Sequence, residues 1–530
     1  MEIQPDDKSI SDLLFEMRSK GVKLWSENGI LRYKAPKGRI SAEENETIRA
    51  RKHEIVNFLQ RKSAAAIGDI RLGARKIYSP APVTPCQRWR LEQLYPTYSR
   101  RTVFPVRLLG NVNVEALQQT FERLAQRHES LRTHFLRIGS EVWQNIHAGV
   151  DPNFDMIDLG GVSPGDRMAE INRIITQFYE EKIDVSAYPL FKGTLIKLEK
   201  TEHTLLIHGH DCILDATSFR ILWKELWAIY VSAVENRPTS LPDIPVQLPD
   251  FSVWLQETDV FWKERHEKYW LDRLESAERV RLFAAGHALS GTECRIDTFA
   301  FQIGAEVTTG LRKISRESRT SLGMVVLTAW AAMVLRLVEK TDIVLSYLTS
   351  GRMHPDVENA IGCFMCPLYL RIKIEKNDNF LDLMTRISDE YSTAYGHHDF
   401  GRLLTRRPEI ECVANPMLNW LPRGVFLDAA TVLEGTGPNG ESHHLKIDSF
   451  EYRPTLRDDV RWDLEPCLAL LEGEEQIWGK IYYRTDRIRR HNVELIAENV
   501  RQFTSFLQQS PTARVASVQC LKEISAAGGC

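Results

Sequence analysis

The chain has 530 residues, a formal net charge of −3, 43% hydrophobic residues and 26% charged residues. This length makes a single hydrophobic core unusual, and the near-neutral charge gives no basis for nucleic acid as the main partner. No apolar run reaches the roughly 18 residues that a membrane-spanning helix needs, and the polar start lacks the pattern of a secretory signal. The nine cysteines are scattered and odd in number, which argues against a disulfide framework. We therefore expect a cytoplasmic protein of two large lobes and a small module, with no nucleic-acid or membrane partner.

Residues 1–62 have the pattern of a small separate module. The segment that begins at Ser9 has the spacing of a helix-capping box and precedes an apolar run. Asn28-Gly29 lies between two short apolar stretches, which is the strongest short-range signal of a β-hairpin. A second capping box begins at Ser41 and opens a helix that we expect to reach Leu59. The module is therefore predicted to be helix, hairpin, helix (αββα).

This arrangement resembles the N-terminal β-hairpin (TubC-type) docking domains of nonribosomal peptide and hybrid polyketide assembly lines. The resemblance implies that the hairpin binds an acidic peptide from the C-terminus of the upstream synthetase subunit, with Lys23, Trp25, Arg32 and Lys34 as contact residues. The charge fits, because basic residues surround the hairpin and Glu27 is the one acid among them. The basic residues are Arg18, Lys20, Lys23, Arg32, Lys34, Lys37 and Arg39. An alternative stays open, in which Lys and Arg only solvate an edge strand and discourage aggregation.

Beyond a linker predicted over residues 63–77, the chain alternates between strand-like and helix-like segments. Such alternation predicts a layered α/β (α+β) architecture. We expect an N-terminal lobe over residues 78–250 and a C-terminal lobe over residues 251–530. Strands are expected over 103–109, 205–207, 343–347 and 477–483, and helices over 114–127, 218–234, 321–337, 380–395 and 492–507.

The stretch from His208 to Ser218 is the most informative part of the chain. It reads as the end of a buried strand that runs into a turn carrying imidazoles and carboxylates. The segment His210-Asp211-x-x-x-Asp215-Ala216 is similar to an acyl-transfer signature, His-His-x-x-x-Asp-Gly. Asp211 stands where that signature has its second His, the residue expected to act on the proton of the nucleophile.

Seven motifs in the same order together resemble the condensation domains of nonribosomal peptide synthetases. They are Thr84–Leu91, Arg127–Phe135, His210–Ala216, Asp250–Trp254 with Tyr269-Trp270, Thr349–Arg352, Ile361–Phe364 with His397–Asp399, and Asp463-Leu464 with Gly479–Asp486. The resemblance implies a chloramphenicol-acetyltransferase-like fold, in which two lobes form a V-shaped pseudo-dimer around a tunnel. It also implies donor and acceptor carrier proteins as partners. Phosphopantetheine would be carried by those partners, and the chain itself would bind no cofactor and no metal.

The resemblance places a candidate reaction site at His210, Asp211 and Asp215. Asp215 is expected to be mainly structural, because a buried carboxylate needs a partner and Arg352 is the candidate by resemblance. His210 is expected either to make local hydrogen bonds or to act directly in the reaction. The residues expected to support the fold or the tunnel are Arg132, Arg352, Ser218 and His208, of which His208 could also serve as a substitute base.

Asp211 leaves the chemistry open. Holding two tethered reactants in one tunnel can lower the barrier by several kcal/mol, and this contribution does not need the missing His. A carboxylate with a pKa of about 4 is a weak base, but burial can raise the pKa or leave a useful hydrogen-bond acceptor. The first hypothesis is a condensation domain that joins a carrier-bound acyl thioester to an amine or a hydroxyl.

Two alternatives remain. One is a catalytically silent, condensation-like platform that recruits carrier proteins or a modifying enzyme. The other is a heterocyclization or other modifying domain, although the first Asp of the heterocyclization motif falls on His210 rather than on Asp211. The pair Cys363 and Cys366 is expected to be small apolar packing on a buried turn rather than a zinc or redox site.

Overall fold

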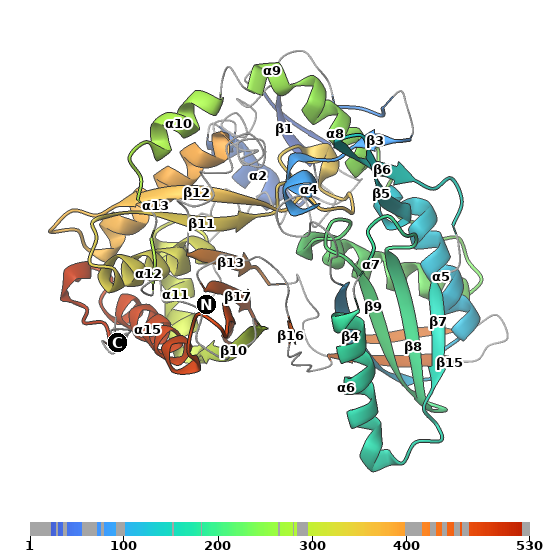
Figure 1. The fold of residues 1–530 in the computed structure, drawn as a ribbon. Helices are drawn as coiled ribbons and strands as arrows, with labels where there is room; N and C mark the ends of the chain where they lie inside the picture. The colour runs from blue at the N-terminus through green and yellow to red at the C-terminus, as the bar shows by residue number, and fades with distance from the viewer. Residues whose placement is uncertain are drawn as a thin grey trace.

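Two lobes, each built around its own β-sheet, lie side by side and are joined at one end by short helices (Figure 1). The computed structural model describes residues 23–27, 30–34, 40–52, 54–55, 72–75, 79–91, 101–150, 153–181, 183–262, 266–278, 280–282, 295–397, 416–423, 431–436, 442–449, 456–457 and 466–521. The mixed α/β architecture confirms the predicted fold class.

The N-terminal lobe is built on a six-stranded sheet of order β14-β15-β4-β9-β8-β7. Its strands are β4 (Arg101–Gly110), β7 (Phe154–Asp158), β8 (Phe191–Glu199), β9 (Glu202–His210), β14 (Thr431–Thr436) and β15 (Ser442–Ser449). Only β7 and β8 run parallel. The central strand β9 pairs with β4 from Glu202↔Leu109 to His210↔Arg101. This pairing holds His210 at the end of a central strand.

Helices cover both faces of this sheet. On one face, α5 (Val114–Arg127) and α7 (Ala216–Val234) pack against the β9 residues Leu205 and Ile207. On the other face, α6 (Pro164–Glu180) packs against Leu206. A strand covered on both sides has no solvent face, so β9 is a continuous apolar run rather than an alternating one.

The C-terminal lobe has a seven-stranded sheet of order β12-β11-β13-β17-β18-β10-β16. Its strands are β10 (Arg295–Ile303), β11 (Asp342–Thr349), β12 (Cys366–Lys373), β13 (Met417–Leu421), β16 (Leu456–Arg457), β17 (Cys467–Glu472) and β18 (Ile477–Arg484). The helices that contribute to its core are α10 (Lys268–Leu274), α11 (Ala305–Glu317), α12 (Leu322–Leu337), α13 (Phe380–Gly396) and α15 (Arg490–Gln509).

The helix α12 is the centre of this lobe. Ser321 caps its first turn by accepting a hydrogen bond from the backbone N–H of Met324. Residues 322–335 are all buried, so α12 is apolar on every side. Among the described residues, no single helix is long and apolar enough to cross a membrane, and α11 with α12 meets that measure only as a pair bent by 109°.

The two halves of the chain are interleaved. The strands β14 and β15 come from the second half of the sequence, yet β15 pairs with β4 in the N-terminal lobe. Its residues Leu445 and Ile447 are buried in the core of that lobe. In addition, the predicted division at 250/251 falls inside α8 (Leu248–Glu257). The predicted lobe boundaries divide the sequence into two halves. In space, the second half of the chain contributes the hairpin β14–β15 to the N-terminal lobe.

A small three-stranded sheet of order β3-β6-β5 lies next to the first two sequence motifs in the chain. Its strands are β3 (Ala81–Pro82), β5 (Thr133–Ile138) and β6 (Glu141–Ile146). Short helices elsewhere in the chain are α4 (Pro85–Trp89), α9 (Asp259–Trp262) and the 3-10 helices η3 (Glu129–Arg132), η5 (Pro355–Val357) and η7 (Val515–Ser517). Thr84 and Gln87 form a capping box at the start of α4. The side chain of Gln87 also donates to the backbone oxygen of Cys212 at 2.9 Å, which ties α4 to the turn after β9.

The front module contains the predicted hairpin. The strands β1 (Lys23–Glu27) and β2 (Ile30–Lys34) are antiparallel, and the pairing Glu27↔Ile30 leaves a two-residue connection. The helix α2 (Ala42–Ala50) begins with the predicted capping box of Ser41 and Glu44. The predicted helix before the hairpin, and the predicted extension of α2 to Leu59, lie wholly or partly outside the described residues.

The end of the predicted linker is packed rather than solvated. The guanidinium of Arg75 lies 2.9 Å from Glu129 and 2.7 Å from Asp250, and all three side chains are nearly buried. The backbone N–H of Arg75 donates to Asp250 as well. Residues 72–75 therefore join the body of the N-terminal lobe.

Candidate functional site

The turn between β9 and α7 brings three of the predicted site residues together. The backbone oxygen of His210 accepts hydrogen bonds from the N–H groups of Ile213 and Leu214, which closes a tight turn directly after the strand. Asp215 is the N-cap of α7 and accepts from the backbone N–H of Ser218 at 2.7 Å. The signature segment is thus a strand end, a turn and a helix start.

His210 is fully buried and engaged inside the turn. Its Nδ1 accepts a hydrogen bond from the backbone N–H of Cys212 at 3.0 Å. An accepting Nδ1 carries no proton, so a neutral ring carries its proton on Nε2. Burial lowers the pKa of His210, which also favours the neutral ring. This geometry supports local hydrogen bonding as the role of His210.

His208 lies two residues earlier on β9, and it points into the layer beneath α6. Its Nε2 is 3.1 Å from the hydroxyl of Thr194, and its ring stacks on Phe178 with 4.8 Å between centroids. The residue is almost completely buried. These contacts support the core role that the sequence favoured for His208 over a substitute base.

Asp211 is the partly exposed carboxylate of the turn. Its side chain is 26% exposed, whereas that of Arg90, directly after α4, is 6% exposed. The Oδ2 atom of Asp211 lies 3.7 Å from Nε of Arg90, and its Oδ1 lies 3.5 Å from Nδ1 of His210. Burial alone would lower the pKa of Arg90, but its acidic neighbours, Cys363 and Asp211 foremost, hold that pKa above its ordinary value. Asp211 therefore faces a charged guanidinium.

Asp215 is held by partners on all sides. Its two oxygens accept from Nη1 of Arg352 at 2.8 Å and from Nη2 at 3.1 Å. They also accept from the hydroxyl of Ser218 at 2.7 Å and from the backbone N–H of Phe364 at 3.0 Å. The sequence-based pairing of Asp215 with Arg352 is therefore present, and the buried carboxylate has the donors it needs.

This network joins the two sequence halves. The hydroxyl of Ser218 accepts a hydrogen bond from the backbone N–H of Gly362 at 2.9 Å, and it lies 2.8 Å from the backbone oxygen of Gly362, which competes with Asp215 for its single proton. Gly351 precedes Arg352 with a φ of +62°, and a Cβ at this position would lie 1.7 Å from the backbone oxygen of Phe364. Only glycine fits such an approach. The guanidinium of Arg352 also lies over the Phe364 ring, 4.4 Å from its centroid.

Arg132 is placed elsewhere in the N-terminal lobe. It lies 3.9 Å from Glu129 and donates to the backbone oxygen of His147. These contacts brace the start of β5. The predicted docking residues Lys23, Trp25, Arg32 and Lys34 lie in the strands β1 and β2 of the hairpin.

Three residues of the turn carry atoms that could in principle bind a metal ion. His210, Asp211 and Cys212 bring candidate ligand atoms within 4.8 Å of one another. However, Nδ1 of His210 already accepts from Cys212, and the buried charge of Arg90 lies beside Asp211. A divalent cation would have to displace that hydrogen bond and bind against an existing positive charge. The donor set does not fit a resident metal.

The Cys-x-x-Cys pair is buried. Burial raises the pKa of Cys363 to about 12, and Cys366 is the first residue of β12. A thiol with so high a pKa is a poor nucleophile and a poor metal ligand near neutral pH. These observations support the packing role that we expected from the sequence.

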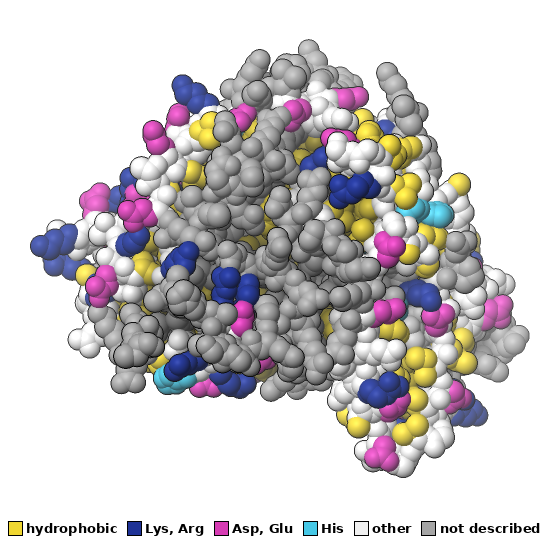
Figure 2. Space-filling model, viewed as in Figure 1, with side chains coloured by type: hydrophobic (Ala, Val, Ile, Leu, Met, Phe, Trp, Pro, Cys, Tyr) yellow, Lys and Arg dark blue, Asp and Glu magenta, His cyan; other side chains and the backbone are white. Residues whose placement is uncertain are grey.

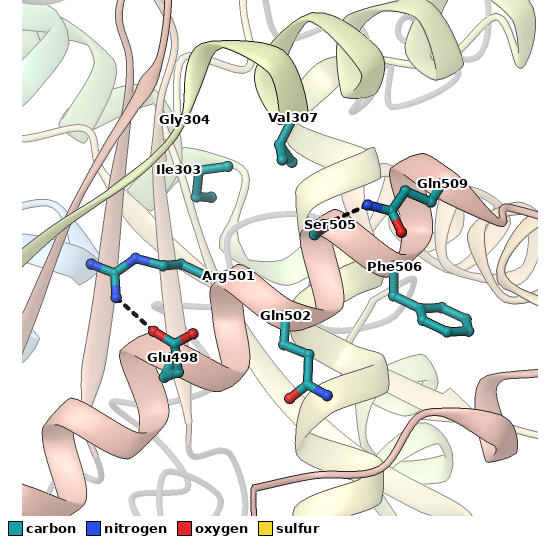
Figure 3. Close-up of a pocket in the computed structure, with 9 residues that line it drawn as sticks. All are labelled: Ile303, Gly304, Val307, Glu498, Arg501, Gln502, Ser505, Phe506 and Gln509. Atoms are coloured by element: carbon teal, nitrogen blue, oxygen red, sulfur yellow. Dashed lines mark hydrogen bonds and ion pairs between the residues drawn. The ribbon is translucent and has the colours of Figure 1, made fainter.

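Two features escaped the sequence analysis. Arg90 was visible only as part of the opening motif, and nothing in the linear order linked it to Asp211, 121 positions away. Likewise, Arg75 lay in a segment predicted to be a linker, and Lys76 directly after it gave the pattern of an exposed basic stretch rather than of an anchor. A hollow of about 440 Å³ between the start of α11 and α15 contains none of the candidate residues (Figure 3). Its charged side chains Arg501 and Glu498 pair with each other at 2.8 Å.

The comparison with known families agrees with this geometry. Residues 78–527 match the condensation domain family, and residues 10–61 match the TubC N-terminal docking domain. The chain therefore belongs to the condensation domain family and carries a docking domain of the TubC type at its front. Domains of this family in nonribosomal peptide synthetases are acyltransferases that act on substrates held by the phosphopantetheine of partner carrier domains.

Solved structures share the fold. The X-domain from teicoplanin biosynthesis superimposes with a TM-score of 0.69 at 20% identity, covering 85% of this chain and 100% of that one. The EpoB cyclization-docking bidomain from Sorangium cellulosum gives a TM-score of 0.66 at 18% identity, covering 93% of this chain and 98% of that one. At these identities the likeness concerns the fold.

Curated relatives are parts of much longer synthetases. One of the linear gramicidin synthase subunits from Brevibacillus parabrevis is 26% identical over 460 residues, which cover 85% of this chain but 9% of that protein. Gramicidin S synthase 2 from Brevibacillus brevis is 28% identical over 421 residues, which cover 78% of this chain and 9% of that protein. The chain thus corresponds to a small fraction of these relatives.

Proposed function

We propose that this chain joins a carrier-bound acyl or peptidyl thioester to an amine, or to a hydroxyl, brought by a second carrier protein. The observation that carries the proposal is the position of Asp211. On a condensation fold, it offers a partly exposed carboxylate where the acyl-transfer signature has its second His. This carboxylate lies in the turn directly after β9, beside the buried residues His210 and Arg90.

The chemistry that fits Asp211 is hydrogen-bond acceptance rather than strong base catalysis. The guanidinium of Arg90 lies beside this carboxylate, and carboxylates in general are weak bases near neutral pH. The carboxylate can still accept a hydrogen bond from the attacking N–H or O–H and so orient the nucleophile. The new bond to the acyl carbon forms as the C–S bond breaks. The leaving sulfur takes the electron pair, and the proton lost by the nucleophile balances it as a thiol.

In this proposal, the other signature residues position rather than react. His210 shapes the turn through its bond to Cys212. Asp215 holds the turn against the segment after Gly351 through Arg352 and Phe364. The chain itself supplies no cofactor to the reaction.

The hairpin is proposed as the receptor of an acidic C-terminal peptide from an upstream synthetase subunit. The register pairs Lys23 with Lys34 and Trp25 with Arg32, so all four predicted contact positions share one face of the hairpin. The opposite face contains Leu24, which is buried. A register that places three basic positions on one face of the hairpin supports binding of an acidic segment.

A silent recruitment platform is the second candidate. The observation that favours it is the ion pair of Arg90 and Asp211, because this contact engages the carboxylate that would otherwise meet the attacking nucleophile. Such a chain would bind carrier proteins without catalysing transfer. A heterocyclization role gains no support from the site, because His210 occupies the first Asp position of that motif.

An intact-mass assay separates the two candidates. A donor carrier protein would carry a simple acyl thioester, and acceptor carriers would present a panel of amines and hydroxyls. Product above the rate without enzyme supports acyl transfer. Absence of product with every acceptor, together with measurable binding of the loaded carriers, would replace this proposal with the platform.

A further inference from the structure

Arg90 is a buried cation beside the turn after β9. It is the C-cap of α4, and its side chain is 6% exposed. Its Nε and Nη1 atoms are buried and make no hydrogen bond with the described residues. A buried charge without such bonds is costly unless an opposite charge lies nearby.

Within the part of the chain that the structure describes, Asp211 is the carboxylate that forms an ion pair with Arg90. The ionisable groups that act on it are Cys363, Asp211, Cys212 and Cys86. Burial raises the pKa of Cys363 to about 12 and raises that of Cys212 well above its ordinary value, so both thiols stay neutral. Cys86 is buried as well, and an ordinary thiol is largely protonated near pH 7. Asp211 is therefore the counter-charge of Arg90.

Asp211 and Arg90 differ in how well water could solvate each charge if the other side chain were removed. Asp211 is 26% exposed and could be hydrated without Arg90, whereas Arg90 is almost completely enclosed. Removal of Asp211 would leave a buried, uncompensated cation, and removal of Arg90 would leave a carboxylate that reaches water. The pair is thus asymmetric, and the stability of the turn depends on Asp211 more than on Arg90.

We propose that Arg90 is a positioning residue that fixes Asp211 as an oriented anion, so that the residues at positions 90 and 211 act as one unit. The inference deepens the proposed acyl transfer, and only its kinetic part rests on that proposal. It has a specific consequence for Asp211→His. The introduced imidazole would lie beside the guanidinium of Arg90. The variant would lack the anion, and the positive charge of Arg90 would disfavour protonation of the imidazole. Restoring a His at position 211 would therefore require Arg90→Met as well.

A double-mutant cycle tests the unit without any assay of activity. We expect Asp211→Ala to lower the thermal midpoint by several degrees, and we expect Arg90→Met combined with Asp211→Ala to recover at least half of that loss. If Asp211→Ala does not fold, soluble yield replaces the midpoint, and the double variant should regain it. Arg88→Met is the matched control, because Arg88 lies on α4 and pairs with Glu141 at the surface. Recovery by Arg88→Met, or none by Arg90→Met, would overturn the proposal.

The kinetic test asks whether the charge at position 90 acts on the reaction. In single-turnover transfer, we expect Arg90→Met to lower the rate by about tenfold with little change in the concentration of acceptor carrier at half-saturation. Arg90→Lys keeps the charge and should recover most of the rate, since the observed contact is an ion pair rather than a bidentate hydrogen bond. Equal rates for Arg90→Met and the wild type would overturn the positioning role. If the wild type forms no product, the acyl-transfer proposal fails, and the stability cycle still decides the pairing.

Discussion

At the scale of single residues, the two carboxylates in the turn after β9 have different surroundings. Asp215 has its oxygens filled by Arg352, Ser218 and the backbone of Phe364, so it serves as a structural tie. Asp211 retains access to solvent, and the described contacts leave it as the group able to meet a ligand. The two carboxylates, four positions apart, thus differ in exposure, because the side chain of Asp215 is 1% exposed and that of Asp211 is 26% exposed.

Asp215→Asn should weaken the tie between the sequence halves. The amide N–H₂ would face donors where a carboxylate oxygen now accepts, and breaking a buried ion pair in this way costs about 3–5 kcal/mol of unfolding free energy. Asp155→Asn is the control, because Asp155 forms a 2.5 Å pair with Lys192 at an exposed site, where the loss should stay below about 1 kcal/mol. Urea unfolding measures both, and equal losses would contradict the structural role of Asp215.

The buried histidines predict a pH dependence of stability. Burial lowers the pKa of His128 below its ordinary value, and the opposing contact of its Nε2 with Glu225 at 2.7 Å does not reverse this, so the fold disfavours the protonated ring. The unfolded chain takes up a proton near pH 6.5, and folding excludes it, so stability is lost as the pH falls below that value. His128→Gln should lose less stability than the wild type between pH 7.5 and 5.5, whereas His354→Gln, at a partly exposed site, should behave as the wild type. Identical losses in both variants would refute this assignment.

At the scale of elements, two hairpins carry predictions of different kinds. The front hairpin β1–β2 presents its basic positions on one face by register. The hairpin β14–β15 instead completes the sheet of the N-terminal lobe from the far half of the chain. The first is a candidate binding element, and the second is a part of the core.

Charge reversal on the front hairpin should weaken its binding to an acidic C-terminal peptide of the upstream subunit. Replacement of Lys23, Arg32 and Lys34 by Glu turns attraction into repulsion, and the effect should be largest at low salt, where screening is weakest. Isothermal titration at two salt concentrations measures it. The same reversal at Arg49, Arg51 and Lys52, around the end of α2, is the control. Unchanged affinity in the hairpin variant would remove the docking assignment.

Ile447→Ala tests whether β15 belongs to the core of the N-terminal lobe. Ile447 is completely buried, and its truncation should lower the unfolding free energy by about 2–5 kcal/mol. Met156→Ala, on the edge strand β7 with 53% exposure, should change it little. If both variants unfold at the same urea concentration, the pairing of β15 with β4 is not a stabilising part of the fold.

At the scale of the whole molecule, local patterns predicted much of the fold. The helix α5 (Val114–Arg127) has the bounds expected from its periodicity, and the Asn-Gly pair predicted the hairpin. The return of β15 to the first sheet could not be predicted, because nothing in its apolar pattern says which sheet it joins. For the same reason, Arg90 and Arg75 were missed, since their partners lie far away in sequence and their packing is tertiary.

The charged side chains of the described residues form no single-sign patch on the face in Figure 2. On the face in Figure 2, positive and negative side chains of the described residues are interspersed rather than gathered into one field. This distribution agrees with the net charge of −3. The function therefore has to be tested at the site.

The most direct test of the account is the rate of product formation by the wild type and by Asp211→Asn in the intact-mass assay with loaded carrier proteins. Asn keeps the shape of the side chain but removes the anion. We predict product from the wild type and a rate about tenfold or more lower in the variant, without a change in carrier binding. No product from the wild type, or equal rates for the two proteins, would contradict a reaction oriented by the carboxylate of Asp211.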